Sequence, residues 1–223
     1  MRNAMAMRQT RTSPLKWRKI LKTTYDELLL LGANDVIVFG SQAMSMYLKR
    51  ALASKDLDLI ATELTLGSVS RLCEKLAPYS DGRAPDYGFT NNKYDGRSNP
   101  VFSIYLKPKD NRPFVLELFQ TYLGHDVRKL TPYVVFRNRF QTLSREAIIG
   151  TRLAFRLPEG ITPFNARRLN KFIEAFRTEI RWGEVTKFVR LFNMEERIAG
   201  NLKKLKEIHN IEILDSERLN FLM

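Results

Sequence analysis

Three acidic residues lie where apolar strands are expected, and their types and spacing suit the binding of divalent cations. Asp56 and Asp58 are two residues apart in the stretch KDLDLI, and Glu117 lies within VLELF. Residues i and i+2 of a strand project from the same face of a sheet, so Asp56 and Asp58 are expected to lie side by side. Two close carboxylates repel each other unless a cation lies between them, and Mg²⁺, which prefers oxygen ligands, suits that place.

Glu117 is predicted to complete this acidic site. An ionised acid inside an apolar strand is costly unless it is paired. Three such acids on neighbouring strands could hold two metal ions, the arrangement that serves in-line transfer of phosphoryl or nucleotidyl groups. Other interpretations stay open at this point. A lone Asp-x-Asp is more often a solvated strand end, and Glu117 could be exposed at a sheet edge or paired with Arg112 or Lys107.

A Gly-Ser turn precedes the acid pair in the chain. Gly40 and Ser41 stand between the apolar run VIVF and a predicted helix. Glycine permits a close backbone approach or a positive φ. Ser41 could cap the helix and offer its amide and hydroxyl to a phosphate, and the helix N-terminus favours an anion. The sequence therefore predicts a phosphate-binding turn next to a metal-binding pair.

These features together resemble the DNA polymerase β superfamily of nucleotidyltransferases. FGSQAMSMYL is similar to the Gly-Gly/Gly-Ser motif of that family, KDLDLI to its metal-binding pair, and VLELF to the strand of its third acid. Within the superfamily, the chain most resembles the small AbiEii-like proteins of toxin–antitoxin and abortive-infection systems. The later stretch TLSREAIIGTRLAFRL resembles a helix that often carries a Lys facing the nucleotide phosphates, and Arg152 stands in that place. A plain salt bridge is the other interpretation of Arg152.

The resemblance implies an activity and a role for each of these residues. Asp56 and Asp58 would bind two Mg²⁺ ions, with Mn²⁺ as the substitute, and Glu117 would bind the catalytic ion and help to activate the attacking hydroxyl. Gly40 and Ser41 would hold the triphosphate of an NTP. The implied reaction transfers NMP to an acceptor hydroxyl on RNA, such as a tRNA end, or on a protein. A toxin-type enzyme of this kind would also have an antitoxin protein as its partner.

Patterns along the chain predict an α/β (α+β) fold with a mixed sheet and a C-terminal helical region. Residues 1–13 are expected to form a flexible basic arm, 14–143 a nucleotidyltransferase-like domain, and 144–223 a basic helical domain. Residues 78–100, rich in Gly, Asp, Asn and Tyr, are predicted to be a long loop. Strands are predicted at 36–39, 57–61, 101–107 and 113–120, with a hairpin around Arg137-Asn138. Helices are predicted from Pro14 with a stop at Gly32, from Gln42 to Leu52, and from Ser68 to an end before Pro78. A break is predicted at Pro158 and Gly160, with a restart at Thr162-Pro163.

The charge of the chain predicts a polyanionic partner. The formal net charge is +13, and the segment from Arg128 to Arg190 holds 14 Lys or Arg against 5 Asp or Glu. Such a field attracts RNA. Arg167, Arg168 and Lys171 span adjacent turns of one predicted helix and could grip a nucleic acid, although a solvated helix face is the alternative.

The content of cysteine, histidine and apolar residues argues against a zinc site and a membrane span. Two histidines and the single Cys73 make zinc ligation improbable, and the lone thiol fits a cytoplasmic protein. No apolar run reaches the length of a membrane span, so a membrane partner is not expected. Two alternatives to the enzyme remain: an inactive nucleotidyltransferase-like scaffold that binds nucleic acid or a partner protein, and a generic α/β protein with neither activity.

Overall fold

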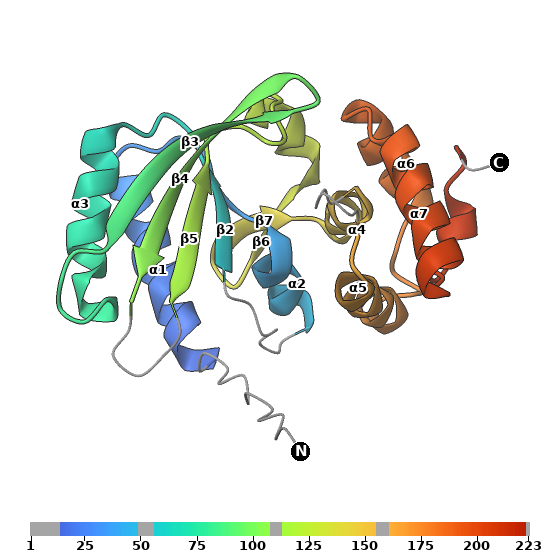
Figure 1. Ribbon diagram of the computed structural model, residues 1–223, viewed down its shortest axis with the longest axis horizontal. Helices are drawn as coiled ribbons and strands as arrows, with labels where there is room; N and C mark the ends of the chain where they lie inside the picture. The colour runs from blue at the N-terminus through green and yellow to red at the C-terminus, as the bar shows by residue number, and fades with distance from the viewer. Residues whose placement is uncertain (1–13, 49–55, 108–112, 155–160, 222–223) are drawn as a thin grey trace, which may run out of the picture.

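A seven-stranded mixed sheet forms the centre of the molecule, and helices cover both of its faces (Figure 1). The computed structural model describes residues 14–48, 56–107, 113–154 and 161–221. The strands are β1 (Val36–Val38), β2 (Asp56–Ala61), β3 (Asp86–Tyr94), β4 (Arg97–Leu106), β5 (Phe114–Phe119), β6 (Val134–Arg137) and β7 (Phe140–Leu143). Their order in the sheet is β3-β4-β5-β2-β1-β7-β6. The predicted mixed sheet with C-terminal helices is therefore confirmed.

The helices divide between the two faces of the sheet (Figure 1). On one face lie α1 and α3, and on the other lie α2 and the C-terminal helices. The helices are α1 (Pro14–Leu30), α2 (Gly40–Leu48), α3 (Leu66–Leu76), α4 (Arg145–Leu153), α5 (Pro163–Ala175), α6 (Trp182–Leu191) and α7 (Glu195–His209). Short 3₁₀ turns span Ala77–Tyr79, Val127–Tyr133 and Ser216–Arg218.

Alternation along β2 and β5 separates an apolar face from an acidic one. Leu57 and Leu59 are fully buried in the cluster that packs against α1 and α3, as are Leu116 and Leu118 of β5. The residues between them point to the opposite face, because successive side chains of a strand alternate. Burial of the leucines therefore fixes the side of the sheet on which the acids of both strands lie.

The face opposite α1 and α3 carries a continuous core that joins the sheet to the C-terminal helices. Met44 and Tyr47 of α2 belong to the same cluster as Phe172 of α5 and Phe188 of α6. The ring of Tyr47 meets that of Phe172 edge-on at 6.0 Å. Side chains from both sides of the predicted boundary at residue 143 thus share one core, and the division into domains there stays a prediction.

The prediction of a long loop over residues 78–100 is wrong. Most of this segment forms β3 and the start of β4, which pair antiparallel from Asp86 opposite Tyr105 to Tyr94 opposite Arg97. Because β3 is an edge strand and mostly exposed, it lacks the alternation of apolar residues that marks a half-buried strand. The turn Asp95-Gly96, with φ values of +50° and +77°, is a common hairpin signal that the composition obscured.

Most other sequence predictions agree with the structure within a few residues. The hairpin around Arg137-Asn138 is present as β6 and β7, and the Thr162 side chain caps the N-terminus of α5. The helix predicted from Gln42 begins earlier, at Gly40. The predicted basic arm, the end of that helix near Leu52, and the break near Pro158 lie outside the described residues. Among the described helices, none is long and apolar enough to cross a membrane.

An ion pair in the C-terminal region makes stability depend on pH. The guanidinium of Arg177 donates to both carboxylate oxygens of the buried Asp215, at 3.0 and 2.8 Å. These hydrogen bonds lower the pKa of Asp215. A carboxyl with a lowered folded pKa stabilises the fold above its unfolded pKa, about 3.9, and this contribution is lost as the pH falls through the folded pKa.

We therefore expect Arg177→Met to lower the free energy of unfolding at pH 7 and to have a much smaller effect near pH 3. Urea denaturation of the parent and the variant at both pH values measures this difference. Lys171→Met, which removes an exposed cation of α5, is the matched control and should change stability little at either pH. An Arg177→Met effect of equal size at both pH values would show that packing, not charge, stabilises this contact.

Candidate functional site

The acids of β2 and β5 lie side by side on one face of the sheet. The two strands are parallel neighbours, and their register places Asp58 directly opposite Glu117. The two side chains are hydrogen-bonded to each other. Asp56 lies two residues before Asp58 in β2, so its side chain is on the same face of the sheet. The structure thus brings together residues that are 59 positions apart in the chain.

This arrangement excludes two alternatives left open by the sequence, an exposed sheet-edge position for Glu117 and a solvated strand end for Asp58. Glu117 lies on β5, which is flanked by β4 and β2 and is not a sheet edge. Lys107 donates to Asp86 at 3.0 Å. Arg112 lies outside the described residues. Asp58 is partly buried and meets a second acid, so it is not a solvated strand end.

Electrostatics at the acid pair favour the uptake of positive charge. Burial raises the pKa of Asp58 well above its usual range, and the charges of Asp56 and Glu117 raise it further. Burial also raises the pKa of Glu117, with a further contribution from Asp56. A proton shared between Asp58 and Glu117, or a bound cation, relieves this repulsion. The site is therefore poised to exchange a proton for a metal ion.

Gly40 provides the close approach that the site requires. It is the first residue of α2 and has a φ of +67°. A Cβ atom placed on Gly40 would lie 2.1 Å from Oδ2 of Asp58, far inside van der Waals contact. The N-terminus of α2 therefore reaches the carboxylate of Asp58 only because residue 40 has no side chain.

A buried arginine links α4 to this helix N-terminus. Arg152 is 7% exposed, and its Nη2 donates to Oγ of Ser41 at 2.7 Å. Burial lowers the pKa of the guanidinium, while the charges of Asp58 and Asp56 act in the opposite direction. Arg152 is thus a buried cation facing the acids, not a surface charge. Its position beside the first turn of α2 suits an anionic group held there.

The side chains of the acidic site fit divalent cations by their chemical type. Carboxylate oxygens are suitable ligands for Mg²⁺, and the repulsion between Asp58 and Glu117 would be relieved by it. Within residues 14–48, 56–107, 113–154 and 161–221, however, no group of three His, Cys, Asp or Glu side chains is already arranged to hold a metal ion. Two acids therefore converge in this structure, and Asp56 contributes through its charge.

A pocket of about 250 Å³ opens beside Asp58 and Gly40. Its walls come from the β3–β4 hairpin, the turn between β1 and α2, Asp58 of β2, the end of β5 with the chain that follows it, and the end of α4. Its lining residues are Phe39, Gly40, Asp58, Asn92, Lys93, Tyr94, Asn99, Phe119, Thr121, Tyr122, Leu123, Thr151, Arg152 and Ala154. The acidic site is thus next to a space large enough for a small molecule.

Sequence reasoning missed the wall that the hairpin supplies to this pocket. Asn92, Tyr94 and Asn99 all fall in the segment that was predicted to be a loop. The hairpin is held to the helical region at its tip, where Arg197 pairs with Asp95 and its guanidinium lies 4.2 Å from the ring centre of Tyr94. The turn signal Asp95-Gly96 could have placed these residues on strands.

The basic residues predicted to contact nucleic acid lie elsewhere. Arg167 and Lys171 are exposed on α5, and the guanidinium of Arg168 lies 4.1 Å from the ring centre of Phe164 on the same helix. None of these residues lines the pocket beside Asp58. Their proposed role therefore concerns a separate surface, and it stays a prediction.

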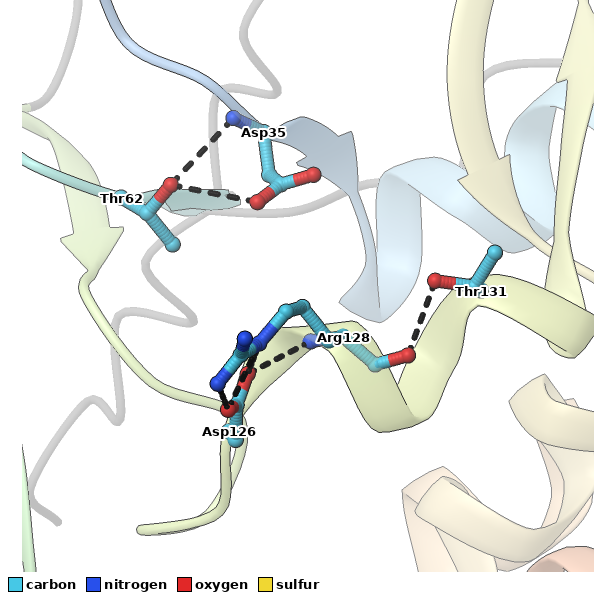
Figure 2. A network of polar contacts seen from close by, with 5 residues as sticks. All are labelled: Asp35, Thr62, Asp126, Arg128 and Thr131. Carbon is cyan, nitrogen blue, oxygen red and sulfur yellow. Dashed lines mark hydrogen bonds and ion pairs between the residues drawn. The ribbon is translucent and has the colours of Figure 1, made fainter.

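A second group of polar residues lies at the far ends of β2 and β5 (Figure 2). Asp35 accepts a hydrogen bond from Thr62 at 3.3 Å, and Asp126 is paired with Arg128. Figure 2 shows the two pairs on separate segments, each hydrogen-bonded within itself. These acids provide a useful contrast to Asp58, because each already has a neutral or cationic partner.

The fold as a whole is distantly similar to that of known nucleotidyltransferases. No family model matches the chain, and no curated protein matches it in sequence. Among solved structures, a candidate nucleotidyltransferase of Helicobacter pylori has 14% sequence identity and a TM-score of 0.49, over 93% of this chain and 90% of that one.

Two further structures are similar over most of the chain. The JHP933 protein of Helicobacter pylori has 15% identity and a TM-score of 0.48, over 96% of this chain and 90% of its own. The nucleotidyltransferase toxin MenT4 of Mycobacterium tuberculosis has 15% identity and a TM-score of 0.41, over 90% of this chain and 73% of its own. Because likeness at this level says nothing about individual residues, the function has to be argued from the site.

Proposed function

We propose that the protein is a metal-dependent nucleotidyltransferase that transfers NMP from an NTP to an acceptor hydroxyl. The observation that carries this proposal is the pairing of Asp58 with Glu117 beside Gly40, at the N-terminus of α2. Acids that repel each other next to a phosphate-binding helix terminus are suited to hold cations against a polyphosphate. The resemblance of the Gly-Ser and Asp-x-Asp motifs to those of the DNA polymerase β superfamily supports the same reaction.

The three acids of the site would bind the cations, and Glu117 would also act on the attacking hydroxyl. Asp56, Asp58 and Glu117 would hold the divalent cations, Mg²⁺ or Mn²⁺, which when bound would neutralise charge on the phosphates and on the reacting oxygens. Glu117 would accept the proton of the attacking hydroxyl. Glu117 lies opposite Asp58 on the neighbouring strand, so one side chain could serve both the cation and the attacking hydroxyl.

The first turn of α2 and Arg152 would hold the triphosphate. The backbone amides at Gly40 and Ser41 begin the helix, where the dipole favours an anion. Arg152 supplies a positive charge in a buried place, and its hydrogen bond to Ser41 positions it at this helix end. In a buried setting such a charge acts more strongly on a phosphate than it would in water.

RNA is the acceptor that the charge of the chain favours. The excess of basic residues between Arg128 and Arg190 would attract a polyanion, and Arg167, Arg168 and Lys171 would contact it. A protein hydroxyl is the rival acceptor. A toxin-type role with an antitoxin partner accords with the AbiEii-like resemblance of the motifs.

A second candidate function is a nucleotidyltransferase-like scaffold that binds nucleic acid or a partner protein without turnover. One observation favours it: three acids are not yet arranged around a metal position within the described residues. This candidate predicts salt-dependent RNA binding that is unchanged when Asp58 is replaced, together with no transfer.

Incubation with each labelled NTP and a mixed RNA pool tests both candidates. The protein is expected to attach label to RNA in the presence of Mg²⁺ or Mn²⁺, and separation of RNA-bound from protein-bound label identifies the acceptor. Asp56→Ala and Asp58→Ala should remove the label. Transfer by these variants at the parental rate would exclude the proposed mechanism. Absence of transfer by the parent, with intact RNA binding, would favour the scaffold.

A further inference from the structure

We infer that the pocket beside Asp58 receives a nucleobase that carries a carbonyl oxygen, such as uracil or guanine and unlike adenine, and that Asn99 selects it. The inference rests on the proposed function, because the pocket is lined by Asp58, one of the proposed catalytic acids. The proposed function does not specify which part of the substrate this pocket binds or which residues recognise that part, and the inference supplies both.

The walls of the pocket suit a flat, uncharged ring. Phe39, Phe119, Tyr94 and Tyr122 all line it. The rings of Phe39 and Phe119 meet edge-on at 5.2 Å, and that of Phe39 meets the ring of Tyr122 at 6.4 Å, so the aromatic surface is continuous. Aromatic surfaces of this kind stack with any base. The volume is near the lower end for small-molecule sites, which begin at about 300 Å³, so it admits one nucleoside and not a longer strand.

The charges of the lining exclude a polycationic occupant. Of the residues that line the pocket, Asp58 is the single carboxylate, whereas Lys93 and Arg152 are cations. An amino sugar or a polyamine would need several carboxylates to balance its charge. A neutral base attached to an anionic phosphate matches this lining, because the base meets the aromatic wall and the phosphate meets Arg152.

Asn99 is oriented by a neighbouring hydroxyl. The residue is 6% exposed, and its Oδ1 accepts a hydrogen bond from Thr121 Oγ1 at 2.8 Å. The orientation of the amide is therefore fixed, and its NH₂ group can donate a hydrogen bond to an occupant of the pocket. Paired reading of adenine uses both the oxygen and the nitrogen of an Asn amide. Thr121 fills one of the two acceptor positions of Oδ1, so the NH₂ group is the less engaged end of the amide, and a carbonyl oxygen of the base is its natural acceptor.

The position of Asn99 in the sheet matches the length of a nucleotide. Asn99 lies on β4 four residues before Ser103, which is opposite Glu117. At about 3.3 Å per residue, Asn99 and the level of Glu117 are roughly 13 Å apart. Because the separation is an even number of residues, both side chains are on the same face of the sheet. Asn92 is opposite Asn99 and also lines the pocket, so the amides are together at the end distant from the acids.

Binding of nucleosides in the presence of EDTA tests this inference without metal or turnover. Isothermal titration of the full chain should show uridine or guanosine binding about fivefold more tightly than adenosine, the effect of one net hydrogen bond. Asn99→Ala should remove this preference. Thr121→Val should reduce the difference in affinity between these nucleosides and adenosine, because the Asn99 amide can then rotate. Asn91→Ala, on the opposite face of β3, is the matched control and should leave the preference intact.

Two further arms identify the source of the base. If the base belongs to the NTP, UTP or GTP will compete with the bound nucleoside, and short RNA oligonucleotides will compete equally whatever their 3′-terminal base. If the base belongs to the acceptor, oligonucleotides ending in U or G will compete better than those ending in A. Equal affinity of all nucleosides, or an unchanged preference in folded Asn99→Ala, would overturn the inference even if transfer is observed. Loss of transfer with this preference intact would instead count against the proposed function alone.

Discussion

Replacement of Asp58 by Asn is expected to abolish nucleotidyl transfer while leaving the metal-free protein at least as stable as the parent. The substitution removes a ligand of the proposed cations, which contribute several kcal/mol of charge stabilisation, so a loss of about 10³-fold or more in rate is expected. Asp58 is held against Glu117 and near Asp56. An Asn at this place keeps a hydrogen bond to Glu117 and carries no charge.

The sign of the stability change follows from the raised pKa of Asp58. A carboxyl whose folded pKa exceeds its unfolded value of about 3.9 destabilises the fold increasingly as the pH rises from the unfolded towards the folded pKa. Asp58→Asn removes this dependence and should therefore raise the free energy of unfolding at pH 7. Urea denaturation in EDTA and the labelled-NTP assay measure the two effects.

Asp35→Asn is the matched control for this substitution. Asp35 precedes β1 and accepts a hydrogen bond from Thr62 (Figure 2), which follows β2 four residues beyond Asp58. It should retain transfer activity and should not gain stability. A loss of stability in Asp58→Asn at pH 7 would contradict the view that the acids repel each other. Retained transfer would remove Asp58 from the catalytic site.

Replacement of Gly40 by Ala is expected to lower activity by at least about 10²-fold and to destabilise the fold. The new Cβ would lie 2.1 Å from Oδ2 of Asp58, so the carboxylate or the start of α2 has to move. Displacement of a catalytic group by about 1 Å can cost that much in rate. The φ of +67° adds a backbone penalty of roughly 1–2 kcal/mol for a residue with a side chain.

Gly32→Ala separates these two effects. Gly32 follows α1 and has a φ of +86°, but a Cβ there meets nothing within 4 Å. Thermal unfolding should show a similar backbone penalty in both variants, whereas the transfer assay should show a loss only in Gly40→Ala. Full activity of Gly40→Ala would mean that close contact between α2 and Asp58 is not needed for the reaction.

The sequence alone determined which residues form the acidic face. Period-two alternation along β2 and β5 buries Leu57, Leu59 and Leu116, and the acids are then forced onto the other side. The same local rules placed Gly40 and Ser41 at the start of a helix, since a glycine and a small hydroxyl residue after a buried strand end that strand. These features depend on neighbours in the chain, which is why they could be inferred without coordinates.

Only the tertiary structure decided what those residues contact. The parallel register that sets Asp58 opposite Glu117, and the hydrogen bond from Arg152 to Ser41 across 111 residues, arise from strand order and helix packing. No local pattern encodes such long-range pairings. The hairpin wall with Asn99 was hidden for a related reason: an exposed edge strand needs no apolar alternation, because its neighbour β4 supplies its hydrogen bonds.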